Sequence, residues 1–351
     1  MLRKKVFKGI KKKGIVESQM AWIFILFAGI LILTVFYKIA VNQKQVGELR
    51  IQAEISSKIR SAITSFSTGY ETKSEIKTAN APIKNSCEGI SVKNSRPIKI
   101  NVFSFEELKP KTSNLLVYSV PWSFPFDVDN LVLLIEPETK LIIVKNSKYS
   151  TTISRIKESF PEKANIIEVN TFQEALKEEG IGKKRIILFE SNENIINQNV
   201  GKDFSVINII PIKDIESFGK IDFYEPKLTG NSYELTPRGS SYYLGFSMLL
   251  AGINSDMEIY DCNFKKNLEK LNYFLLILEE RTNQIYRNLD PGSECKNSIN
   301  KANEIVRTLK TKLNQVLKNL NENTLIDFYD LVEKLKTANN ELILKSCPEI
   351  Y

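Results

Sequence analysis

The sequence predicts a protein of mixed class, α/β plus all-α. We expect an N-terminal transmembrane helix, a compact and mostly parallel α/β sheet domain, and a C-terminal antiparallel three-helix bundle. Three patterns predict this: an uncharged apolar run near the N-terminus, short β-branched runs alternating with helical patterns, and heptad spacing near the C-terminus. The expected segments are a basic cytoplasmic segment (1–19), a transmembrane helix (20–41), an amphipathic stalk helix (42–68), a linker with short strands (69–125), the α/β domain (126–256) and the bundle (257–351).

The apolar run from Met20 to Tyr37 contains 18 residues without a charge, about the minimum for a helix that crosses a hydrocarbon core of roughly 30 Å. Seven Lys and Arg residues and one Glu precede it, whereas the charges after it are sparse and mixed. The positive-inside rule therefore predicts a single-pass protein with a cytoplasmic N-terminus and with residues 42–351 outside. A removable signal peptide needs small residues at the cleavage site that follows its apolar core. Lys38 stands there, so we expect an uncut anchor in the lipid bilayer.

The N-terminus also resembles the leader of archaeal type IV pilin-like proteins. The stretch "KKKG", the short polar step with Glu17 and the following apolar helix carry this resemblance, which covers about thirty residues. It implies a cut by a dedicated peptidase between Gly14 and Ile15. The family places its glutamate further from the cut, and no Gln follows Gly14. An ordinary membrane anchor is therefore the favoured interpretation.

Net charge and composition exclude several classes of function. The formal net charge is +8; residues 1–19 hold +6 of it and Lys38 one more, which leaves +1 for the rest. The basic character is thus a topology signal, and it implies no nucleic-acid partner. The chain contains no histidine, which excludes Ser-His-Asp and Cys-His nucleophiles and histidine-ligated metals. With no recognisable catalytic motif, the sequence leans against an enzyme, and no cofactor or metal is expected.

Between the anchor and the α/β domain the sequence predicts a helix and little else that is regular. Apolar residues spaced four, four, four and three apart form one helical face: Ile51, Ile55, Ile59, Ile63 and Phe66. This face suits either a free stalk or, the favoured interpretation, a helix packed on its own ectodomain. One strand is expected within 98–105, and 120–126 should be a loop because of its two prolines.

In the α/β domain, near-continuous apolar strands separated by helices predict four to six mostly parallel strands. Helices are expected near 149–160 and 171–179, a hairpin turning at 137–140, and a buried helix at 238–256. Ligands in such sheets bind beyond the carboxyl ends of the strands, so the candidate loops are 145–152 and 190–194. In the first, the hydroxyls of Ser147, Ser150, Thr151 and Thr152 could bind an anion at a helix start or, the favoured alternative, simply cap the helix.

The apolar periodicity of residues 257–351 predicts three helices. The first covers about 262–288. The second carries a heptad seam, and the third repeats the pattern; breaker and capping residues at 289–293 and 319–324 separate them. Such short connections favour antiparallel helices that pack on each other. The alternative, a coiled coil that binds a partner, is less favoured. The seam of the second helix consists of Ile299, Ala302, Val306, Leu309, Leu313, Val316 and Leu320.

Four cysteines in an exported chain predict two disulfides, with three pairings open from the sequence alone. The geometry of the antiparallel helices chooses among them. Cys295 and Cys347 lie at similar distances from the turn near Glu322, so they should sit side by side. Cys262 starts the first helix, roughly 40 Å away at 1.5 Å per residue, and by elimination it should pair with Cys87.

Three functions fit these features. The leading hypothesis is a membrane-anchored, extracytoplasmic structural or interaction protein of the cell surface, with other surface or pilus-type proteins as partners. The others are a ligand-binding receptor domain, and an extracytoplasmic enzyme that relies on carboxylates, for which Asp127 and Asp129 are the nearest acidic pair. As a whole the chain resembles uncharacterised membrane-anchored surface proteins of archaea, through its N-terminus, the segment "GINSDMEIYDCN" and the cysteine-bearing C-terminal helices. That resemblance brings no activity with it.

Overall fold

The computed structural model describes residues 13–68, 73–78, 81–93, 95–110, 114–192 and 195–351, and residues 55–351 form one compact unit. The helices are α1 (Lys13–Thr68), the short 3-10 helix η1 (Ser147–Tyr149), α2 (Ser150–Ser159), α3 (Phe172–Lys177), α4 (Phe246–Asn254), α5 (Met257–Asn288), α6 (Glu294–Lys318) and α7 (Glu322–Leu344). The strands are β1 (Lys73–Lys77), β2 (Ile83–Ser86), β3 (Gly89–Val92), β4 (Val102–Phe103), β5 (Glu107–Leu108), β6 (Asn114–Ser123), β7 (Asp127–Ile135), β8 (Lys140–Val144), β9 (Asn165–Val169), β10 (Lys184–Phe189), β11 (Asn199–Val200), β12 (Phe204–Pro211), β13 (Phe218–Thr229) and β14 (Ser232–Leu244).

A single helix, α1, contains both the apolar run and the amphipathic segment that the sequence predicts. It is long and apolar enough to cross a membrane, a test that an anchor and a signal segment both pass. Its last turns belong to the compact unit, where Ile55, Ile59, Ile63 and Phe66 are buried in a cluster with residues of β6 and β7. The prediction that this face packs on its own ectodomain is therefore confirmed from Ile55 onward, whereas Ile51 is exposed.

A four-stranded sheet in the order β1-β6-β7-β4 lies against this end of α1, and β3-β2-β5 form a small separate sheet. The prediction that residues 120–126 form a loop is wrong for its first four residues, because β6 continues to Ser123. Proline is tolerated in an edge strand, where no ladder hydrogen bond needs its missing N–H. Among the described residues, β1 pairs with residues 114–118 of β6, and Pro121 lies where β7 is the strand paired with β6.

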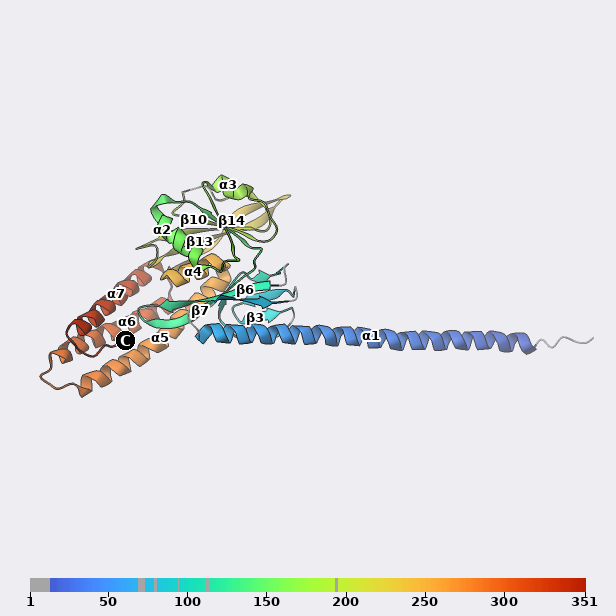
Figure 1. The fold of residues 1–351 in the computed structure, drawn as a ribbon, viewed down its shortest axis with the longest axis horizontal. Helices are drawn as coiled ribbons and strands as arrows, with labels where there is room; N and C mark the ends of the chain where they lie inside the picture. Colours follow the sequence, from blue (N-terminus) through green and yellow to red (C-terminus); the bar gives the residue numbers. More distant parts are fainter. Residues whose placement is uncertain (1–12, 69–72, 79–80, 94, 111–113, 193–194) are drawn as a thin grey trace, which may run out of the picture. The chain divides into compact units, whose positions relative to one another are not determined.

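The second large sheet has seven strands in the order β11-β14-β13-β12-β10-β8-β9. Strands β12, β10, β8 and β9 pair in parallel, whereas β11, β14, β13 and β12 pair antiparallel. The prediction of a mostly parallel sheet of four to six strands is therefore wrong: the sheet is mixed and larger. The long β13–β14 ribbon supplies the antiparallel half (Figure 1).

Two further predictions in this region are wrong. Residues 133–144 do not form a hairpin, because β7 pairs with β6 and β4 while β8 pairs with β10 and β9. The turn at 136–139 therefore passes from one sheet to the other. The helix expected over 238–256 begins only at Phe246, because β14 continues through Leu244. Gly245, with φ 83°, makes the corner between them, a conformation that glycine adopts without steric cost.

The C-terminal end of α4 is held by a fully buried arginine. Arg185 on β10 donates to the carbonyl oxygens of Ile253 and Ser255 and, at 2.8 Å, to the Asp256 carboxylate. A cation at the carboxyl end of a helix offsets the negative end of the helix dipole. This contact therefore fastens α4 to the seven-stranded sheet.

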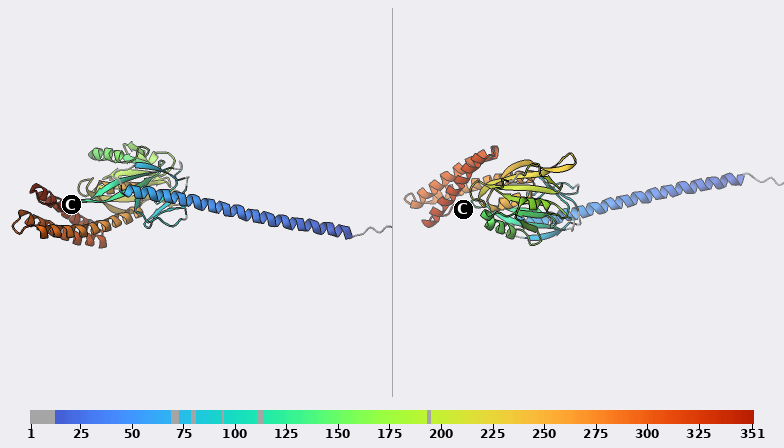
Figure 2. Two further views of the ribbon diagram at one scale, coloured as in Figure 1. Left: turned by 60° about the horizontal axis from the view of Figure 1, so that its bottom comes forward. Right: turned by 90° about the horizontal axis from the view of Figure 1, so that it is seen from above.

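Helices α5, α6 and α7 pack together, with α6 against both neighbours (Figure 1). The predicted seam of α6 is buried from Ile299 to Val316 in the same cluster as the seams of α5 and α7. α6 and α7 run antiparallel, since Lys301 pairs with Glu341 and Lys312 with Asp327. Parts of the three helices extend beyond the sheets in both views of Figure 2.

The structure contains two disulfides, with the pairing that the helix geometry predicts. Cys295 joins Cys347 across the end of the α6–α7 hairpin, with a Cα–Cα distance of 5.5 Å. Cys87 joins Cys262 at the start of α5, with a Cα–Cα distance of 5.7 Å. The first closes the α6–α7 hairpin, and the second ties the small sheet to α5.

Candidate functional site

Two features of the compact unit could bind a partner: a crevice at the carboxyl ends of β8 and β10, and a groove between α6 and α7. The crevice lies where the parallel strand order changes direction. β8 and β10 are adjacent in the sheet. After β8 the chain passes through α2 to β9, on the far side of β8, whereas after β10 it passes to β12, on the far side of β10. Ligands of open α/β sheets bind at such switch points.

The crevice encloses about 250 Å³, and two asparagines fix its walls. Asn146, just after β8, donates through Nδ2 to the carbonyl oxygen of Phe189 (3.1 Å), and its Oδ1 accepts from the backbone N–H of Lys148 (3.0 Å). Asn208, on β12, accepts from the N–H of Ser191 (3.1 Å) and donates to its carbonyl oxygen (3.3 Å). The loops after β8 and β10 are thereby held at fixed positions.

Two of the three charges at the crevice neutralise each other, whereas Lys145, which lines it, forms no ion pair among the residues that the structure describes. Glu190, which follows β10 with φ 47°, forms an ion pair with Lys148 at 2.5 Å. Hydrogen bonds from Lys148 and then Tyr149 lower the pKa of Glu190, while the hydrogen bond to Glu190 raises the pKa of Lys148. Burial raises the pKa of Tyr149. Because Lys148 is already paired and Lys145 on the lining is not, the site suits a small polar ligand that is neutral or carries one negative charge.

The four hydroxyl residues of the predicted ligand loop do not line this crevice. Ser147 lies on η1, and Ser150 and Thr151 are exposed at the start of α2. Thr152 is buried and donates to a carboxylate oxygen of Glu216 (3.2 Å). The side-chain cap observed here belongs to Asn146, which caps η1, whereas α2 has no side-chain cap.

The crevice is lined instead by the residues next to those hydroxyls and by the second predicted loop. Glu190 and Ser191 of that loop contribute, while residues 193–194 lie outside the described part of the chain. Sequence reasoning placed Asn146 within the first candidate loop without singling it out, and it missed Asn170 and Thr171. Their signal was available, since each directly follows the end of a parallel strand or comes one residue later.

The remaining predicted residues have structural partners or remain untested. Asp129 pairs with Lys270 of α5 at 2.6 Å, and Asp127 accepts from Ser123. Both carboxylates are therefore engaged in packing the β6–β7 hairpin and α5. Gly14 and Ile15 lie in the first turn of α1, and cleavage between them stays a prediction.

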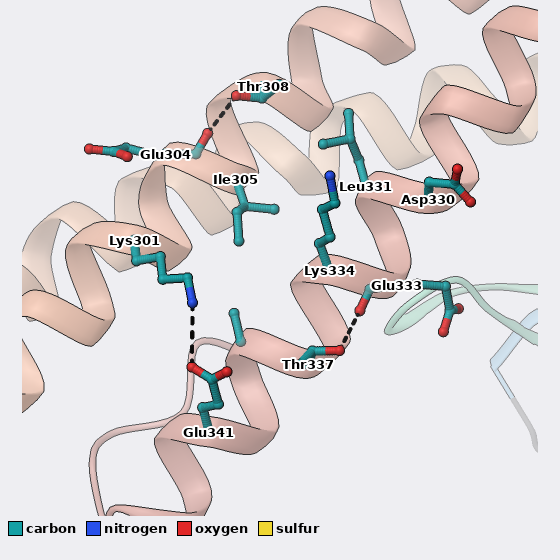
Figure 3. A pocket seen from close by; sticks show the side chains of 11 residues that line it. Lys301, Glu304, Ile305, Thr308, Asp330, Leu331, Glu333, Lys334, Thr337 and Glu341 are labelled. Atoms are coloured by element: carbon teal, nitrogen blue, oxygen red, sulfur yellow. Dashed lines mark hydrogen bonds and ion pairs between the residues drawn. The ribbon is translucent and has the colours of Figure 1, made fainter.

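The groove between α6 and α7 is the larger feature, with a cavity of about 830 Å³ (Figure 3). A second cavity of about 440 Å³ continues it and shares Thr308, Asp330, Leu331 and Lys334. The floor is apolar, formed by the half-buried Ile305 and Leu331 and the buried Ala338, whereas charged side chains form the rims. A long, straight groove of this kind has the geometry of a site for a helix.

No protein-family model, curated protein or solved structure matches this chain. The function therefore has to be inferred from the chain's own residues.

Proposed function

We propose that the protein is a membrane-anchored, extracytoplasmic interaction protein of the cell surface, and that a pilus-related subunit is one form this role could take. α1 carries the proposal. It combines a long apolar segment, whose side chains are nearly all exposed, with a last section that is buried in a disulfide-linked unit.

Exposed apolar side chains in such a run favour burial in lipid, because transfer of apolar surface out of water contributes about 25 cal/mol per Å². The disulfides point the same way, since stable disulfides belong mainly to oxidising compartments outside the cytoplasm. The basic flank before the apolar segment supports a cytoplasmic N-terminus. The apolar helix, the basic flank and the disulfides thus all support a folded unit outside the cytoplasm.

Alkaline carbonate extraction of membranes, followed by intact mass measurement, tests the anchor. We expect the protein to stay with the membrane pellet and to begin at Met1 or, after methionine removal, at Leu2. A mature N-terminus at Ile15 would reveal pilin-type processing and leave the anchor in place. A soluble product that begins after the apolar segment would overturn the proposal.

A ligand-binding receptor domain is the second candidate, and the crevice at the switch point favours it. Thermal-shift screening with small polar compounds, both neutral and singly negative, tests this function. A compound that raises the melting temperature of the wild type, but not of Asn146→Ala, would support a receptor. An equal shift in wild type and variant would place its binding elsewhere and count against the crevice. Lys163→Gln, far from the crevice lining, is the matched control.

A further inference from the structure

We infer that the groove between α6 and α7 receives the same hairpin of a second copy of this chain, forming a two-fold symmetric four-helix bundle. This inference names a partner for the proposed interaction protein, and it rests on that proposed function because it assumes the membrane anchor. Anchoring in one membrane confines the copies to a plane, which raises their effective concentration for each other.

The groove is a second helical seam on each helix. On each helix the residues that line the groove are spaced four, three, four and three apart. Each helix therefore has an inner seam, which packs in the core of the three helices, and an outer seam, which lines the groove. The outer seam of α6 consists of Lys301, Ile305, Thr308, Lys312 and Gln315; that of α7 consists of Asp327, Leu331, Lys334, Ala338 and Glu341. Four-helix bundles pack around positions with this spacing, and Ile305, Leu331 and Ala338 supply the apolar ones here.

The charges of the groove favour α6 as the helix that lies over α7. On the α6 side the lining has two lysines and one glutamate, a net charge of +1, whereas on the α7 side it has one lysine and four carboxylates, a net charge of −3. A two-fold axis along the groove places α6 of each copy over α7 of the other, antiparallel to it. The basic side of each copy then faces the acidic side of its partner.

The same operation fixes the register. The disulfide between Cys295 and Cys347 (Cα–Cα distance 5.5 Å) and the ion pair between Lys301 and Glu341 (3.7 Å) share one register and show which positions of the two helices lie at equal height. Rotation about an axis parallel to the helices preserves height. Lys301 of one copy therefore lies level with Glu341 of the other, and the apolar floors of the two copies face each other.

Two charges of the groove are left for the partner. Among the residues that the structure describes, neither Glu304 nor Lys334 forms an ion pair. In the bundle, Glu304 of one copy and Lys334 of the other lie on facing helices about one helical turn, roughly 5.4 Å, apart along the axis. A lysine side chain spans that offset, so the symmetric bundle forms this pair twice.

A charge swap at these two positions tests the inference on the full-length chain in detergent, with two affinity tags to detect pairing of copies. Glu304→Lys alone and Lys334→Glu alone each place like charges opposite each other, and each should weaken self-capture about tenfold. When the two variants are mixed, opposite charges face each other again at both sites, and capture should return to the wild-type level. Lys163→Glu, on a different surface, is the matched control and should capture like the wild type.

Restoration by mixing supports the inference, because changes within one chain are the same in the homotypic and mixed pairs. Absence of wild-type self-capture would overturn it, as would a mixed pair no stronger than either variant alone. The second result would place the contact between copies outside the groove and leave the groove for a helix of another protein. Carbonate extraction reports on the anchor and capture reports on the groove, so the two proposals fail separately.

Discussion

Truncation of Ile59 in α1 tests whether the end of this helix is part of the folded ectodomain. The side chain is fully buried in the cluster that α1 forms with the four-stranded sheet. Ile59→Ala removes three carbon atoms, which at about 0.8 kcal/mol per buried methylene corresponds to about 2.4 kcal/mol of transfer free energy. The cavity left behind adds to this, and we expect a loss of about 3 kcal/mol in the free energy of unfolding.

Ile51→Ala is the matched control, since Ile51 lies eight residues earlier on the same helix and is 47% exposed. Its cost should stay within about 0.5 kcal/mol, as for other surface substitutions. Pulse proteolysis of the full-length chain in detergent over a urea series measures both values. Equal effects at the two positions would refute packing of α1 on the ectodomain and restore the free-stalk interpretation.

Three further predictions follow from the fold. Arg185→Leu leaves the Asp256 carboxylate without its cation and should lower the free energy of unfolding by about 3 kcal/mol; a loss below about 1 kcal/mol in urea unfolding would contradict this. Replacing both Cys295 and Cys347 with serine opens a loop of 52 residues and should cost about 4 kcal/mol, and an unchanged urea midpoint would count against it. Hydrogen bonds from Lys310 and the charges of α6 lower the pKa of Glu279 below its ordinary value of 4.5. The stability that this carboxylate contributes is therefore present above pH 4.5 and lost as the pH falls through the depressed pKa; a gap between wild type and Glu279→Gln that persists or grows in acid would contradict the assignment.

The helical part of the fold was predictable because its signals are local and periodic. Most buried residues of α6 and α7 are heptad positions read from the sequence, with Asn303, Ala338 and Asn339 in addition, and the breaks between helices lie at the predicted loops. The pairing of Cys295 with Cys347 followed from the same regularity. Positions equidistant from the turn of an antiparallel hairpin lie side by side, so the sequence separation was enough to place them.

The sheets were harder to predict because an apolar strand does not specify its partner. β7 and β8 look like the two arms of a hairpin, yet each is buried in a different sheet. Pro121 suggested a loop, although it lies in β6, which is paired there with β7 and, in the part of the chain that the structure describes, with β7 alone. In each case the deciding contact is long-range, and no local pattern contains it.

The candidate sites depend on tertiary structure in the same way. The strand-end rule placed the two loops near the crevice, but the hydroxyl residues turned out to face elsewhere, while the neighbouring Asn146 and Glu190 line it. The groove needed both helices in their observed register. Its outer seams are mostly polar, so hydrophobic periodicity alone did not reveal them.

Sidedness labelling tests the central claim, a membrane-anchored protein whose folded unit lies outside the cytoplasm. Two single substitutions are compared, Ser147→Cys on the exposed η1 and Lys5→Cys in the basic N-terminal segment; the native cysteines are held in disulfides. A membrane-impermeant maleimide added to intact cells should label Ser147→Cys at once, and Lys5→Cys only after permeabilisation. Labelling of Lys5→Cys in intact cells, with protection of Ser147→Cys until the cells are permeabilised, would contradict the account.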